Sequence, residues 1–153
     1  MGQIGMQVEQ ALKEAMRARR RDEINVLKMV RTELQYAAKE KQRDLTEEEE
    51  IQILTRMIRK RQEALEMYRA GGRADRQAEE AREIAIIERF LPRKLGREDV
   101  LPIIEAVIRE IGAQGPRDFG KVMGAVMRRL RGQRVDGAEV RAWVEERLSR
   151  GSD

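Results

Sequence analysis

Residues 119–137 read FGKVMGAVMRRLRGQRVDG, and the spacing of their apolar side chains predicts a helix that buries one face. Two glycines, Gly120 and Gly124, leave another face of this helix without side chains. A glycine inside a helix costs about 0.8–1 kcal/mol relative to alanine, so we expect the bare backbone to admit the close approach of another polymer. The residues of the apolar face follow the i, i+3, i+4, i+7, i+11 pattern and are Phe119, Val122, Met123, Val126 and Leu130.

The same stretch is strongly basic, whereas the whole chain, with 32 basic and 28 acidic residues, has a net charge of only +4. The positive charge is therefore concentrated in part of the chain and is not spread evenly along it. A second basic run, Arg17–Arg21, lies near the end of the first predicted helix. Concentrated positive charge favours a polyanionic partner, although a solvated arginine-rich surface explains any one cluster as well. We expect the RNA-contacting residues, if RNA is the partner, to be Gly120, Lys121, Gly124, Arg128, Arg131 and Arg134.

Composition favours an all-α protein without catalytic machinery. Hydrophobic residues make up 41% of the chain, charged residues 39% and aromatic residues 3%, with three prolines. The chain has no cysteine and no histidine, which removes disulfides, the usual zinc ligands and the commonest general base. We therefore expect no catalytic residue, no metal site and no cofactor. The nearest group of carboxylates, Glu79, Glu80 and Glu83, has the spacing of solvent-facing partners for Arg76 and Arg82.

Helical periodicity, together with the positions of capping residues, glycine and proline, divides the chain into two parts. Long amphipathic helices are predicted through the first part, with a capping box at Thr46 and Glu49 and a stop at Gly71–Gly72. The acidic run Glu47–Glu50 then marks a helix N-terminus rather than a metal site. The segment PRKLGRED at 92–99 is the predicted boundary.

Three shorter helices are predicted beyond this boundary. The second ends at Gly132, and the last begins at a capping box of Asp136 and Glu139. The expected fold is all-α: an N-terminal long-helix hairpin domain over 1–92, then a small C-terminal three-helix bundle over 93–153. No apolar run reaches the roughly 18–20 residues that cross a bilayer, and no signal peptide is recognisable, so we expect a cytoplasmic chain without a membrane partner.

Four segments occur along the chain in the order LKMVRTEL (27–34), RKRQEALEMYRAGGRAD (59–75), FLPRKL (90–95) and FGKVMGAVMRRLRGQRVDG (119–137). Together they resemble the bacterial YqeY family. That resemblance covers nearly the whole chain and implies two helical domains. The C-terminal part is similar to the tail domain of the B subunit of aspartyl/glutamyl-tRNA amidotransferase, which contacts tRNA away from the reaction centre.

The resemblance does not carry the amidating chemistry into this chain. In the amidotransferase that chemistry belongs to a separate cradle that binds ATP and magnesium, and no Walker-type glycine loop is present here. A label of glutamine-dependent carbon–nitrogen ligase would be inherited by relationship. The stretch TELQYAA at 32–38 departs from the family's more basic pattern, so no site is transferred to it.

Two functions remain open at this stage, with an independent enzyme as a less favoured third. The first is a module that binds tRNA or another structured RNA through its backbone. The second is a protein-interaction adaptor, for example for an amidotransferase or an aminoacyl-tRNA synthetase. Gly120 and Gly124 would then serve only to let neighbouring helices pack closely, so their exposure distinguishes the two explanations of the glycines.

Overall fold

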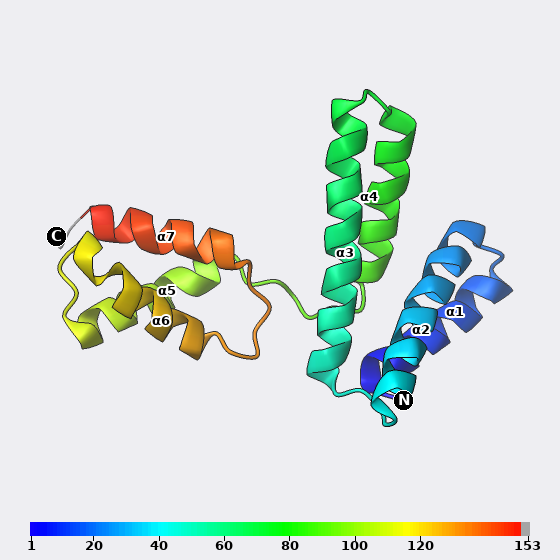
Figure 1. Cartoon of the computed structure of the whole chain (residues 1–153), viewed down its shortest axis with the longest axis horizontal. Coiled ribbons are helices and arrows are strands. Elements are labelled where there is room, and N and C mark those ends of the chain that lie inside the picture. The colour runs from blue at the N-terminus through cyan, green and yellow to red at the C-terminus, as the bar shows by residue number, and fades with distance from the viewer. Residues whose placement is uncertain (151–153) are drawn as a thin grey trace. The chain divides into compact units, whose positions relative to one another are not determined.

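The computed structural model describes residues 1–150, and every regular element in that range is helical (Figure 1). This confirms the all-α class predicted from composition. By its internal contacts the chain divides into two compact units, Met1–Leu91 (unit 1) and Pro92–Asp153 (unit 2).

Unit 1 consists of two helical hairpins. α1 (Gln3–Arg17) pairs with α2 (Arg21–Lys41), and α3 (Glu47–Ala70) pairs with α4 (Ala74–Glu88). A single apolar core joins the hairpins, because each helix turns one aliphatic stripe inward. Its most deeply buried members are Val8, Leu27, Val30, Leu54 and Ile87.

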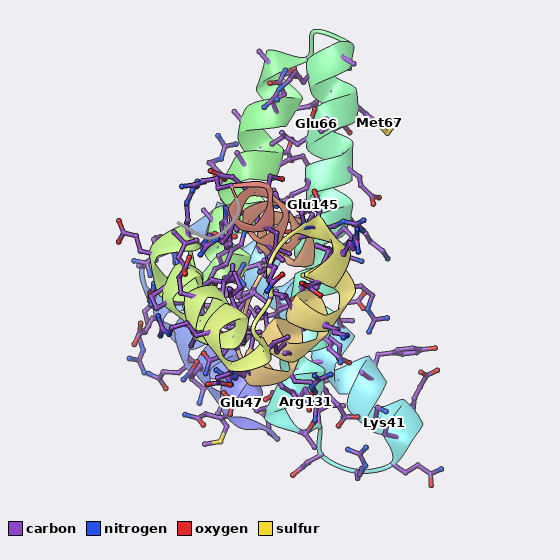
Figure 2. The ribbon with its side chains drawn as sticks, turned by 90° about the vertical axis from the view of Figure 1, so that its left-hand side faces the viewer. Lys41, Glu47, Glu66, Met67, Arg131 and Glu145 are labelled. Atoms are coloured by element: carbon purple, nitrogen blue, oxygen red, sulfur yellow. The ribbon has the colours of Figure 1, made fainter. Side chains whose placement is uncertain are left out.

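The α3–α4 hairpin extends beyond α1 and α2 (Figure 1). No residue between 59 and 85 belongs to the buried core of unit 1. Near the distal end, Met67 has 75% of its surface exposed and projects from α3 (Figure 2). The connecting turn contains Gly72 at φ 71°, a left-handed conformation that glycine adopts without strain. The predicted stop at Gly71–Gly72 is thereby confirmed.

The start of α3 contains a contact that the sequence did not predict. Thr46 and Glu49 form the predicted capping box, with Thr46 Oγ1 accepting from the Glu49 N–H at 3.1 Å. Glu50 is only 1% exposed, and its role is not limited to a favourable interaction with the dipole of its own helix. Its carboxylate instead accepts hydrogen bonds from the N–H groups of Ile4 (3.3 Å) and Gly5 (2.7 Å), in the first turn of α1.

Two glycines make room for this carboxylate. A Cβ atom on Gly2 would lie 2.4 Å from Glu50 Oε1, and one on Gly5 would lie 3.2 Å from Glu50 Oε2. Glu50 therefore caps α1 from a distant helix, and the glycines at the start of α1 allow its close approach.

Unit 2 is a three-helix bundle. It contains α5 (Arg97–Ile111), a short 3₁₀ turn η1 (Pro116–Asp118), α6 (Phe119–Arg129) and α7 (Gly137–Ser149). Its core is almost entirely aliphatic and includes Val100, Ile104, Val107, Val122, Val126, Leu130, Val140 and Val144.

The predicted helix boundaries in unit 2 need two corrections. α6 ends at Arg129, before the predicted stop at Gly132, which adopts the left-handed conformation at φ 84°. Asp136 caps α7 as predicted, accepting from the Glu139 N–H at 3.3 Å. The Glu139 carboxylate does not close the box, because it accepts a hydrogen bond from Lys94 Nζ at 2.6 Å.

Candidate nucleic-acid interface

The apolar face of α6 fixes which side of the helix faces outward. Val122 and Val126 are fully buried and Leu130 is 2% exposed, all within the core shared with α5 and α7. Because side chains at i, i+4 and i+8 share one face, Gly120 and Gly124 lie on a different face from this stripe. The strong amphipathicity of α6 therefore presents the glycines away from the core.

Gly120 and Gly124 are not packed against another helix. Gly120 is exposed, and a Cβ atom added there would have no neighbouring atom within 4 Å. A Cβ atom on Gly124 would contact only the end of the Arg128 side chain, with Nη1 at 3.5 Å. The explanation that these glycines let α5 or α7 approach α6 is therefore wrong.

Three cations lie beside the glycines. Lys121, Arg128 and Arg131 are exposed, and none forms an ion pair with any residue that the structure describes. Figure 2 shows Arg131 just after the end of α6. We call Gly120, Lys121, Gly124, Arg128 and Arg131 the α6 patch.

Two neighbouring basic residues of unit 2, unlike the three cations, have partners among the described residues. Arg129 pairs with Glu110. Arg134 is half-buried: its carbonyl accepts from the Leu95 N–H at 2.8 Å, and its guanidinium donates to the Pro92 carbonyl at 3.3 Å. Arg134 thus connects the loop before α7 to the segment before α5, and we leave it out of the α6 patch.

The charges on α5 and α7 are largely balanced by their own partners. Arg93 and the Gly96 N–H hold the pKa of Asp99 below its usual value. Arg97 and Arg150 similarly lower the pKa of Glu146. Such pairing neutralises several basic residues of α5 and α7, whereas the three cations of the α6 patch have no acidic partner among the described residues.

The carboxylates considered for catalysis do not form the expected set of surface pairs. Glu79 pairs with Arg76 at 3.2 Å as predicted, but Glu83 accepts from Arg61 Nε of α3 at 2.9 Å rather than from Arg82. Glu80 is half-buried with one oxygen lacking a hydrogen-bond partner, and burial together with Glu83 raises its pKa.

Residues 1–150 contain neither a metal cluster nor a membrane-spanning helix. In that range, no group of three or more acidic residues is arranged to hold a metal ion. No helix there combines the length and apolar character needed to cross a bilayer.

Comparison with known proteins gives a family match across both units. The sequence model of the YqeY-like protein family matches residues 6–148. An uncharacterised protein of Schizosaccharomyces pombe is 29% identical over 85 residues, covering 56% of this chain and 69% of that protein. The mitochondrial protein "Altered inheritance of mitochondria protein 41" of Pyrenophora tritici-repentis is 22% identical over 138 residues, covering 88% of this chain and 75% of that protein. Neither relative's name states a ligand or a reaction.

Proposed function

We propose that this chain, which belongs to the YqeY-like family, is a non-catalytic helical module that binds the backbone of tRNA or another structured RNA. The contact surface is the α6 patch. One observation carries the proposal: two glycines that no other helix covers lie beside three cations that have no acidic partner among the described residues.

Recognition of the RNA backbone fits this surface better than recognition of bases. Base stacking needs exposed aromatic rings, and those of unit 2 are engaged. Trp143 packs against the core, and the Phe119 ring is covered by the Arg141 guanidinium at 5.3 Å from its centroid. Lysine and arginine beside a bare stretch of main chain suit phosphates and riboses, which present the same chemistry in every sequence.

Salt dependence tests the proposal. Each phosphate neutralised contributes about −0.7 to −0.9 to the slope of log K against log salt. Replacing Lys121, Arg128 and Arg131 with alanine should therefore flatten the slope by about 2–3 if each contacts one phosphate. The measurement is fluorescence anisotropy of a labelled tRNA transcript titrated with the full chain at several salt concentrations.

A matched triple variant controls for loss of net charge. Arg93, Arg97 and Arg150 each have a carboxylate partner on α5 or α7, so replacing them with alanine removes the same charge from another part of unit 2. We expect this control to keep nearly the wild-type slope. If the two triple variants bind tRNA with the same affinity and slope, the α6 patch is not the RNA contact.

The adaptor role remains a second candidate because of a groove between α2 and α3. The groove has a volume of about 660 Å³, and its lining includes Met29, 41% exposed, and Tyr36, 63% exposed. An adaptor should lose its protein partner when Met29 and Tyr36 are both replaced with serine, with tRNA affinity unchanged. In-cell crosslinking of the wild type and this variant measures that loss.

A further inference from the structure

The basic run at the end of α1 gains two arginines from a distant helix. Arg17 ends α1 and Arg21 begins α2, with Arg19 and Arg20 in the turn between them. The fold brings Arg82 of α4, and Arg89 directly after the end of α4, to this turn. The residues line a pocket of about 470 Å³, which we call the arginine pocket: Arg20, Arg21, Asp22, Glu23, Arg82, Ala85, Ile86 and Arg89.

One carboxylate positions two of these arginines. Glu23 accepts from Arg20 Nε at 2.8 Å and from Arg89 Nη2 at 3.0 Å. Burial works to raise the pKa of Glu23, but the hydrogen bonds from Arg89 and Arg20 outweigh it and lower the pKa. Glu23 is therefore ionised at neutral pH and fixes both guanidinium groups at the pocket.

Two other arginines of the pocket have no acidic partner. Arg21 and Arg82 are exposed, and neither forms an ion pair within residues 1–150. The four arginines of the lining exceed Asp22 and Glu23 by 4 − 2 = +2. Arg17 and Arg19, the adjacent residues of the turn, add further positive charge that no described carboxylate balances.

We infer that the arginine pocket binds phosphate groups and that these belong to an RNA backbone. A guanidinium is a planar fork of donors that matches phosphate oxygens in a bidentate manner, and here two are fixed and two are free. Two backbone phosphates would balance the surplus charge of the lining. The choice of RNA as the source of these phosphates rests on the proposed function of the chain, whereas the pocket itself belongs to unit 1 and shares no residue with the α6 patch of unit 2.

The test replaces the two unpartnered arginines. An Arg21→Ala, Arg82→Ala variant leaves the Glu23 network intact and removes side chains that have no described partner. If the two arginines contact two phosphates, the slope of log K against log salt for a tRNA transcript should flatten by about 1.4–1.8. The control is Arg56→Ala, Arg59→Ala on α3, which removes two exposed arginines that also lack a described ion pair. Equal slopes for the two double variants would overturn the inference.

The triple α6 variant separates this inference from the proposed function. Flattening in the arginine-pocket variant alone would support the pocket and contradict the α6 patch, and flattening in the triple variant alone would do the reverse.

A second measurement separates RNA from a small phosphate ligand. ¹⁵N NMR of the arginine Nε–H groups in the full chain would be recorded with added inorganic pyrophosphate. Saturable pyrophosphate-induced shifts at Arg21 and Arg82, with tRNA binding unchanged in the arginine-pocket variant, would overturn the assignment to RNA.

Discussion

Replacing Gly124 distinguishes a functional glycine from a structural one. Gly124 lies in the middle of α6, and a Cβ atom there would make one ordinary contact, at 3.5 Å from the end of the flexible Arg128 side chain. Alanine is favoured over glycine in a helix interior by about 0.8–1 kcal/mol, so Gly124→Ala should stabilise unit 2 by that amount. For a unit of this size, such a gain raises the melting temperature by about 4–8 °C.

The chain offers a local probe for this measurement. Trp143 is its single tryptophan and packs against the core of unit 2, so its fluorescence follows the unfolding of that unit. Thermal and urea unfolding of wild type and Gly124→Ala should therefore differ in the tryptophan signal. Gly71→Ala, in the turn of unit 1, is the control and should leave that signal unchanged.

A larger side chain should separate stability from binding. Leucine has nearly the helix propensity of alanine, so Gly124→Leu should remain at least as stable as wild type. Its isobutyl group would occupy the open strip of the α6 patch, and we expect tRNA affinity to fall on the order of tenfold, or about 1.4 kcal/mol. A destabilised Gly124→Leu, or one that binds tRNA as tightly as wild type, would refute the reasoning.

Three further predictions concern unit 1 and can be followed by far-UV circular dichroism. Glu50→Ala should destabilise the unit by about 1.5–3 kcal/mol, because the N–H groups of Ile4 and Gly5 lose a charged acceptor, whereas the exposed Glu47→Ala in the same acidic run should cost little; equal effects would contradict the capping role. Glu49 has a pKa well below its usual 4.5, chiefly because of Arg43, so its stabilising contribution is present above pH 4.5 and is lost as the pH falls; Glu49→Gln should show a weaker loss of stability on acidification. Glu80 has a raised pKa and an oxygen without a hydrogen-bond partner, so Glu80→Gln should stabilise the unit at pH 7, and this difference should shrink as acid protonates Glu80 in the wild type.

Local signals in the sequence predicted much of this fold. The apolar spacing of Val122, Val126 and Leu130 depends only on helix periodicity, and the Thr46–Glu49 box involves residues three apart. The left-handed turn at Gly72 likewise needs only its neighbours in the chain. The same periodicity separated Gly120 and Gly124 from the buried stripe, although only the structure shows that no other helix covers them.

Contacts between helices could not be predicted in this way. Glu50 belongs to an acidic run that is typical of a helix N-terminus. Nothing in the local sequence indicates that its carboxylate reaches the first turn of α1. Arg82 and Arg89 come to the basic turn only because α4 packs beside α2 with one particular rotation about its axis. The sequence places Arg134 among the patch cations, and only the structure shows that it donates to the Pro92 carbonyl. Each depends on distances between residues more than forty positions apart, on which helical periodicity gives no information.

The most direct test of the RNA-binding surface is ¹H–¹⁵N NMR of the full chain as a tRNA transcript is added. Glycine amide signals fall in a distinct region of such spectra, so Gly120 and Gly124 can be followed individually. We predict that their signals, with those of Lys121 and Arg128, shift or broaden at low salt and return as salt is raised. Binding of tRNA that leaves residues 119–131 unperturbed, or the absence of any binding at low salt, would contradict the assignment of RNA recognition to α6.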